Sequence, residues 1–265
     1  MKQNPSMNPH YSPPSRLLGV LESRFVLELG LYGLARPWLK IFPKGDGHPV
    51  MVIPGFIAGD VTTVVIRQGL QQCGYVVQGW QEGINRGMPP KIQGRLIQRI
   101  RKLAETSQHK VSLVGWSLGG VLARELARQQ PEIIRGVITL GSPLQGNSQS
   151  TRFLKKAPLL EIPQSFPEIL DSFPWRHLPP PVPTTAIYTR FDGIVDWHCS
   201  QESLQPQVEN IEVPSSHYGL GFNPLVLYVI ADRLSQPENH WRPFDYKGWR
   251  QYVYRAGDSF RERKF

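Results

Sequence analysis

Residues 111–120 combine an apolar strand pattern, a single serine and the start of a helix, and few folds accommodate that combination. Residues 111–116 are apolar and partly β-branched, as in a buried strand, and a helical pattern begins at Leu118. Residues 115–119 follow the pattern Gly-x-Ser-x-Gly. Glycines on both sides of Ser117 let the strand and the helix pass close to each other. The pattern predicts that Ser117 occupies a strained turn, with its hydroxyl raised above a sheet.

Further short apolar runs alternate with helical patterns along the chain. We expect strands at residues 48–54, 75–77, 137–140 and 184–189, and a further strand at 211–213, which alternates like a half-buried strand. Continuous apolar strands that alternate with helices are typical of a parallel sheet covered on both faces. A chain of 265 residues fits one large α/β domain better than two small ones.

The domain organisation follows from changes in composition. We expect an N-terminal arm and an amphipathic helix over residues 1–47, an α/β domain over 48–244 and a polar, basic tail over 245–265. Within the domain, residues 144–183 interrupt the alternation and end in a proline-rich stretch. Long insertions of this kind are usually functional, which favours a small helical cap over the site. A plain connecting excursion is the alternative.

Residues 17–41 are apolar enough to be considered as a membrane span. Four charged residues interrupt them, so no apolar run approaches the roughly 20 residues that a span requires; these are Glu22, Arg24, Glu28 and Arg36. We expect a helix that packs on the domain, with weak peripheral association with a membrane as the alternative. The N-terminus shows no secretory signal, so we expect a cytoplasmic protein.

The chain carries a formal net charge of +9, which raises the question of nucleic acid as a partner. The basic residues are spread over predicted helix faces and the C-terminal tail, without interleaved aromatic residues or a known nucleic-acid motif. We therefore expect no nucleic-acid partner. No zinc motif, phosphate-binding loop or dinucleotide fingerprint occurs, and we expect neither a metal nor a cofactor.

A serine hydroxyl is a poor nucleophile at neutral pH and needs a base, which in turn needs an orienting acid. Four of the seven histidines follow Ser117, and three of them, His198, His217 and His240, are considered as the base. His217 alone comes directly after a predicted sheet strand, whereas His240 lies in a polar stretch near the C-terminus. His217 is therefore the predicted base.

Two acids share the loop after the strand at residues 184–189. Asp192 comes directly off the strand end, where a tight turn can aim its carboxylate at His217. Asp196 lies further along and can brace the loop instead. We favour Asp192 as the acid and keep Asp196 as the alternative.

Acyl chemistry at a serine also needs two N–H groups directed at the developing negative charge. The backbone N–H of Leu118, directly after the nucleophile, is one candidate. The second is expected in the loop after the first strand, where the backbone N–H of Phe56 follows a proline and a glycine.

Together these residues resemble the bacterial α/β-hydrolases of the esterase and lipase type, and the small triacylglycerol lipases among them. The resemblance covers about residues 48–244 and is carried by five stretches, namely Ile53–Phe56, Gly115–Gly120, Thr139–Pro143, Tyr188–Val195 and Ser216–Gly221. It implies an α/β-hydrolase fold with a minimal, mostly parallel sheet of about six strands and a cap after the sixth-strand position of that fold. Pro54 stands where many lipases carry a histidine, but the donor there is backbone.

The resemblance also implies Ser117, Asp192 and His217 as a catalytic triad, with the N–H groups of Phe56 and Leu118 as the oxyanion hole. We therefore expect a serine esterase or lipase that cleaves carboxylic esters, with a small-molecule ester or lipid as substrate. The same residues serve an acyltransferase or a thioesterase, and a non-catalytic binding module on the same fold is a further alternative.

Overall fold

The computed structural model describes residues 11–146, 150–151 and 165–257. Residues 1–10 of the predicted arm and 258–265 of the predicted tail lie outside the described residues. The same is true of most of the middle of the predicted cap, between residues 147 and 164.

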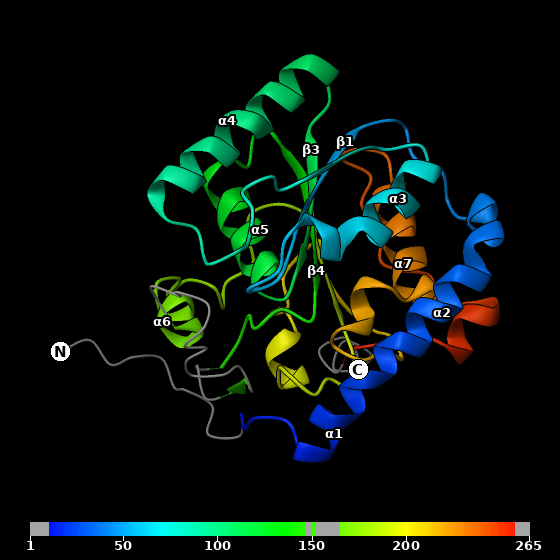
Figure 1. Cartoon of the computed structure of the whole chain (residues 1–265). Coiled ribbons are helices and arrows are strands. Elements are labelled where there is room, and N and C mark those ends of the chain that lie inside the picture. The colour runs from blue at the N-terminus through cyan, green and yellow to red at the C-terminus, as the bar shows by residue number, and fades with distance from the viewer. Residues whose placement is uncertain (1–10, 147–149, 152–164, 258–265) are drawn as a thin grey trace.

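A mostly parallel sheet of seven strands forms the centre of the molecule (Figure 1). Its spatial order is β2-β1-β3-β4-β5-β6-β7, and β1 to β6 all run parallel. The carboxyl ends of these six strands therefore meet along one edge, where sites in such sheets are built. The strands are β1 (Pro49–Ile53), β2 (Val76–Gly79), β3 (Val111–Trp116), β4 (Ile134–Leu140), β5 (Thr184–Tyr188), β6 (Val208–Glu212) and β7 (Arg255–Ala256).

The six expected parallel strands are present, and the short antiparallel β7 joins them at one edge. Its residues Ala256 and Arg255 lie opposite Ile211 and Glu212 of β6. Tyr254, only 1% exposed, holds this part of the chain in place, because its hydroxyl donates to the carbonyl oxygen of Leu225 at 3.0 Å. A strand of two residues has no alternating pattern, so the sequence analysis did not predict it.

Helices cover both faces of the sheet, as expected (Figure 1). Successive residues of β1 point to opposite faces: Met51 and Ile53 join one core, whereas Val50 and Val52 join the other. The first core lies under α4 (Pro90–Ser107) and α5 (Leu118–Gln129), and the second under α3 (Val64–Gln72) and α7 (Pro224–Leu234). Short 3-10 helices connect these elements, namely η3 (Asp60–Thr63), η5 (Trp197–Ser200), η6 (Gly219–Gly221) and η7 (Gly248–Tyr252).

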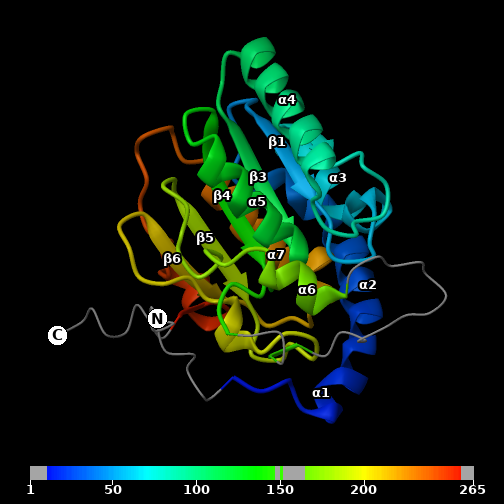
Figure 2. The same cartoon turned by 90° about the vertical axis from the view of Figure 1, so that its left-hand side faces the viewer.

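The helix expected over residues 17–41 is divided into four pieces, which we call the N-terminal segment. It lies on the side of the sheet that carries α3 and α7 (Figure 1) and runs down one side of the molecule in Figure 2. Among the described residues, no helix has the length and apolar character needed to cross a membrane. The pieces are α1 (Arg16–Leu21), η1 (Glu22–Arg24), α2 (Phe25–Ala35) and η2 (Arg36–Ile41).

The predicted cap falls between β4 and β5, and its described part contains α6 (Phe166–Asp171). A capping box starts this helix: Ser165 and Glu168 each accept a hydrogen bond from the other's backbone N–H. Phe166 is fully buried, and its ring lies 5.2 Å from that of Phe56 in the loop after β1. The helix α6 thus packs at the carboxyl edge of the sheet, where the cap is expected.

A buried ion pair fastens α5 to this region. Arg124 of α5 donates to Glu202 Oε2 at 2.7 Å and to the carbonyl oxygen of Leu178 at 2.9 Å. The Arg124 and Glu202 side chains are 1% and 0% exposed. Burial raises the pKa of Glu202 to about 7, while the Arg124 charge acts in the opposite direction. Removing the arginine alone would leave a buried acid without its cation.

We predict that Arg124→Met lowers the free energy of unfolding by roughly 3–5 kcal/mol, since one half of a buried pair is then uncompensated. Urea denaturation followed by circular dichroism measures this loss. The matched control is Arg101→Met, because Arg101 is exposed on α4 and donates to Gln130 Oε1. A loss for Arg124→Met as small as that of the control would contradict the structural role of the pair.

Candidate active site

The parallel sheet brings the predicted site residues to one edge. Ser117 directly follows β3, Asp192 lies in the loop after β5, and His217 lies in the loop after β6. The strands β4, β5 and β6 pair in register, and β3 pairs with β4 up to Trp116 opposite Leu140. The loops that follow these strands consequently leave the sheet at the same level.

Ser117 occupies the strained turn that the motif predicts. Its backbone has φ 53° and ψ −120°, in a region that residues with a Cβ rarely adopt. Its N–H donates to the carbonyl oxygen of Leu140 at 2.8 Å, and its carbonyl accepts from Gly120 at 3.0 Å, so both sides of the turn are held. Among the described residues, the buried Ser117 Oγ has no hydrogen-bond partner. Backbone strain at a reactive side chain is typical of functional sites.

The two glycines of the motif are required by close backbone contacts. A Cβ on Gly115 would lie 2.3 Å from the carbonyl oxygen of Gly119, and a Cβ on Gly119 would lie 2.2 Å from that of Ile53. Both contacts are far inside van der Waals distance and involve backbone that cannot move aside. The glycines therefore let the helix α5 start close against β1 and β3.

The structure pairs His217 with Asp192. His217 Nδ1 lies 2.6 Å from Asp192 Oδ2, and the two side chains are 2% and 1% exposed. The second oxygen, Oδ1, accepts from the backbone N–H groups of Ile194 at 2.8 Å and Val195 at 2.7 Å. The carboxylate is thus held by its own loop with one oxygen aimed at the imidazole.

This environment raises the pKa of His217 above its ordinary value of 6.5. Burial alone lowers the pKa, because the charged imidazolium loses hydration. The negative charge of Asp192 and its hydrogen bond outweigh that effect, and the charge of Glu22 acts in the same direction. The site therefore favours a protonated imidazole once a proton arrives.

Asp196, the alternative acid, has other partners. Its Oδ1 lies 2.8 Å from His198 Nδ1 and accepts from the His198 N–H at 3.0 Å, which caps η5. Its Oδ2 accepts from the backbone N–H of Ser12 at 3.2 Å. These contacts brace the loop, and they favour Asp192 as the residue that orients His217.

The two predicted N–H donors lie in the loop after β1 and at the start of α5. Leu118 is the first residue of α5, where N–H groups have no partner within the helix. Phe56 lies beside Gly55, and a Cβ on Gly55 would come within 3.3 Å of Ser117 Cβ. The loop after β1 thus passes directly over the serine.

Asn85 holds that loop in place, which the sequence analysis did not foresee. This fully buried side chain donates to the carbonyl oxygen of Pro54 at 2.7 Å. Its backbone N–H donates to Ala58 at 2.8 Å, and its carbonyl accepts from Ile57 at 2.8 Å. Three hydrogen bonds on both sides of Phe56 therefore fix where the Phe56 N–H lies.

A carboxylate from the N-terminal segment joins the loop of Asp192 to the loop of His217. Glu22 is only 3% exposed, and its Oε1 accepts from the backbone N–H groups of Gly193 at 2.7 Å and His217 at 3.0 Å. Its Oε2 accepts from the Tyr218 N–H at 3.0 Å. One side chain thus links the residue after Asp192 to the backbone of His217.

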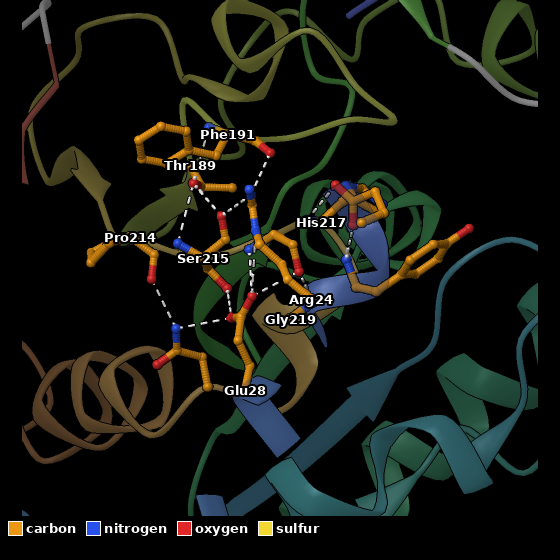
Figure 3. A network of polar contacts seen from close by, with 12 residues as sticks. Arg24, Glu28, Thr189, Phe191, Pro214, Ser215, His217 and Gly219 are labelled. Atoms are coloured by element: carbon orange, nitrogen blue, oxygen red, sulfur yellow. Dashed lines mark hydrogen bonds and ion pairs between the residues drawn. The ribbon is translucent and has the colours of Figure 1, made fainter. Parts of the chain in front are cut away.

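Glu28 of α2 makes a second connection to the loop before His217 (Figure 3). Its Oε1 accepts from both the N–H and the hydroxyl of Ser216, each at 2.8 Å. Its Oε2 accepts from Asn223 Nδ2 at 3.0 Å and from the Ser215 hydroxyl. Each oxygen of Glu28 thus accepts two hydrogen bonds, and these compensate the carboxylate for the water that it loses on burial.

Arg24 completes the network and reaches both loops. Its guanidinium donates to the carbonyl oxygens of Phe191 at 2.7 Å and Ser215 at 2.9 Å (Figure 3). Gly219 leaves room for Glu28, because a Cβ there would lie 2.1 Å from its carboxylate. The N-terminal segment therefore acts as a polar clamp on the loops after β5 and β6.

In the sequence, Glu22, Arg24 and Glu28 stand out only as interruptions of an apolar run. A signal was nevertheless present, since an acid inside an apolar helix needs buried donors elsewhere. The structure otherwise brings the predicted residues Ser117, Asp192 and His217 to one edge of the sheet. Among the described residues, no group of three or more His, Cys, Asp or Glu side chains is arranged to hold a metal ion.

Comparison with known proteins agrees with this architecture. A family model described as the alpha/beta hydrolase fold matches residues 93–178, from α4 to the predicted cap. A search of curated proteins found no match. The strand order, the strained serine after β3 and the family match together define an α/β-hydrolase fold, as predicted.

Three solved structures illustrate the likeness. Lipase B of Aspergillus fumigatus has a TM-score of 0.56 and 18% identity over 76% of this chain, which spans only 55% of that protein. A structure reported for the metagenome-derived lipolytic enzymes LipS and LipT has a TM-score of 0.56 and 17% identity, and the match covers 73% of this chain and 96% of that chain. Bacillus licheniformis lipase BlEst2 has a TM-score of 0.52 and 15% identity, and the match covers 74% of this chain and 95% of that chain. At these identities the likeness is one of fold.

We predict that the pKa of His217, measured by NMR titration of its imidazole, lies above 6.5 in the wild-type protein. Asp192→Asn and Glu22→Gln should each lower it, because each removes a negative charge that favours the imidazolium. Asp192→Asn should have the larger effect, since its carboxylate also contacts the ring.

Asp196→Asn is the matched control and should leave the titration of His217 unchanged, because Asp196 contacts His198 instead. If Asp196→Asn lowered the pKa of His217 and Asp192→Asn did not, the pairing described above would be incorrect.

Proposed function

We propose that this chain is a serine hydrolase that cleaves carboxylic esters with a lipophilic acyl group. The observation that carries the proposal is the buried His217–Asp192 pair, located at the same sheet edge as the strained Ser117. A nucleophile, a base and an orienting acid in this chain order are the arrangement that acyl transfer to serine requires.

The proposed reaction begins when Ser117 Oγ attacks the ester carbonyl carbon and passes its proton to His217 Nε2. Because Nδ1 faces Asp192, the neutral imidazole carries its proton on Nδ1 and accepts on Nε2. The imidazolium then protonates the alcohol as the C–O bond of the ester breaks. Water, deprotonated by the same histidine, releases the acid from the acyl-enzyme and restores the Ser117 hydroxyl.

The negative charge that forms on the carbonyl oxygen is assigned to the N–H groups of Phe56 and Leu118. The start of α5 supports this role, because the helix dipole places partial positive charge there. The hydrogen bonds of Asn85 support it on the other side, since they keep the loop around Phe56 from moving. A donor fixed before the reaction needs no reorganisation in the transition state.

A lipophilic acyl group is favoured by the apolar surroundings of this loop. Phe166 of α6 contacts Phe56 with ring centroids 5.2 Å apart, and both are buried. A Cβ on Gly141 would lie 2.7 Å from the Leu220 side chain, and His217 and Asp192 are its next nearest neighbours. The apolar Leu220 side chain therefore lies next to the predicted acid and base. The structural neighbours include proteins named as lipases, which agrees with such a substrate.

We expect Ser117→Ala to reduce kcat/KM for p-nitrophenyl esters by at least about 10³-fold, as loss of a nucleophile does. Among wild-type substrates, kcat/KM should rise with acyl-chain length. Ser142→Ala is the control, since Ser142 is a second buried serine, in the loop after β4, to which the proposed reaction assigns no role. Full activity of Ser117→Ala would contradict the proposal.

The pH profile gives a second check in the same assay. His217 must be neutral to accept the serine proton, so activity falls as the pH drops through its pKa, which lies above 6.5.

Adding an alcohol separates hydrolysis from acyl transfer: free acid should remain the main product. Predominant formation of the new ester would indicate a transferase.

A further inference from the structure

The N-terminal segment buries two acids, together with Tyr32 and Leu39, against the protein, and most of its other large apolar side chains face outward. Its two acids, Glu22 and Glu28, are 3% and 8% exposed. Its large apolar side chains are mostly exposed, the opposite of a helix that covers a protein core. The exposed residues, with fractions from 41% to 76%, are Leu17, Val20, Leu21, Val26, Leu27, Leu29, Leu31, Leu34, Trp38 and Ile41.

The outer surface of α2 carries no charge. Within Phe25–Ala35 the sole ionisable acid or base is Glu28, besides the buried Tyr32, and Glu28 is bonded to the loop before His217. Leu27 and Leu34 are 72% and 75% exposed on this helix. A contiguous apolar face of this kind is uncommon on the water-facing side of a protein and marks a contact surface.

The apolar face continues into a groove beside the catalytic loops. The groove has a volume of about 630 Å³ and is bordered by Leu31, Leu34 and Trp38 on one side. Phe191 and Pro214 border it on the other. Phe191 precedes Asp192 in the chain and is 52% exposed, so the face extends to the loop of the predicted acid.

The exposed charges of the segment itself are all positive. Arg16, Arg36 and Lys40 are exposed at its two ends, whereas Glu22 and Glu28, the only acids between residues 16 and 44, are buried. The whole chain also carries +9. Such a border attracts an anionic surface and repels a second copy of the same chain.

We propose that this face of the N-terminal segment docks on an anionic phospholipid bilayer. The segment lies in the plane of the interface, with its leucines among the acyl chains and its arginines and lysine at the headgroups. Trp38 is 65% exposed and lies near Lys40 in the chain. Tryptophans are enriched at membrane–water interfaces, and Trp38 has the exposure that such a position requires. Because Glu22 and Glu28 clamp the loops of His217 and Asp192 from the same segment, docking brings those loops to the lipid surface.

Vesicle co-sedimentation tests the docking without any assay of activity. The full chain should bind vesicles of equimolar phosphatidylcholine and phosphatidylglycerol, and should bind pure phosphatidylcholine vesicles more weakly. High salt should weaken binding to the anionic vesicles. The double variant Leu27→Glu/Leu34→Glu should reduce binding at least about tenfold, because it places charge at the centre of the face.

Two further variants make the result specific. Arg36→Glu/Lys40→Glu should lose binding to anionic vesicles only, by about tenfold or more. Val61→Glu/Val76→Glu, which changes two exposed valines outside the segment, should bind like the wild type. The melting temperature of each variant verifies its folding, and the changed side chains are exposed.

Three results would overturn the proposal. The wild-type protein could remain in the supernatant with anionic vesicles, or Leu27→Glu/Leu34→Glu could bind as the wild type does. Analytical ultracentrifugation could instead show a wild-type dimer that this double variant converts to monomers, without vesicle binding. A second copy of the chain would then cover the face.

Discussion

The carboxylate of Glu22 connects the loop after β5 to the loop after β6 by hydrogen bonds. The geometry of the His217–Asp192 pair depends on this connection. It accepts hydrogen bonds from Gly193 and His217, one on each loop. Parallel pairing brings these loops to the same edge but does not fix their distance from each other. The Glu22 and Glu28 contacts supply that restraint from a part of the chain outside the sheet.

This arrangement explains why the N-terminal segment buries two carboxylates against the protein. Its carboxylates replace the water that the loop N–H groups would otherwise need, and its apolar side chains are left to face outward. Buried acids and exposed leucines on one segment are the reverse of the usual arrangement in water. The exposed leucines are favourable if the outer side of the segment contacts lipid. The same segment then positions the site and locates it relative to a membrane.

Much of the fold and of the site could be predicted from local patterns. Apolar runs mark β1 and most of β3, Ser117 directly follows β3, and His217 lies in the loop after β6. Other features depend on contacts between distant residues. The acceptor role of Glu22 and the hydrogen bonds of Asn85 have no local signature, because their partners lie far along the chain. The strand β7 is fixed by burial of Tyr254 rather than by its own pattern.

The central claim is that Ser117 is the nucleophile that His217 activates. Its most direct test is reaction of the folded protein with a fluorophosphonate, followed by mass spectrometry of the peptides. We expect a single phosphonate adduct on Ser117, formed with loss of fluoride and absent from His217→Ala at matched reaction time. A folded protein that forms no adduct, or one that carries the adduct on another residue, would contradict it.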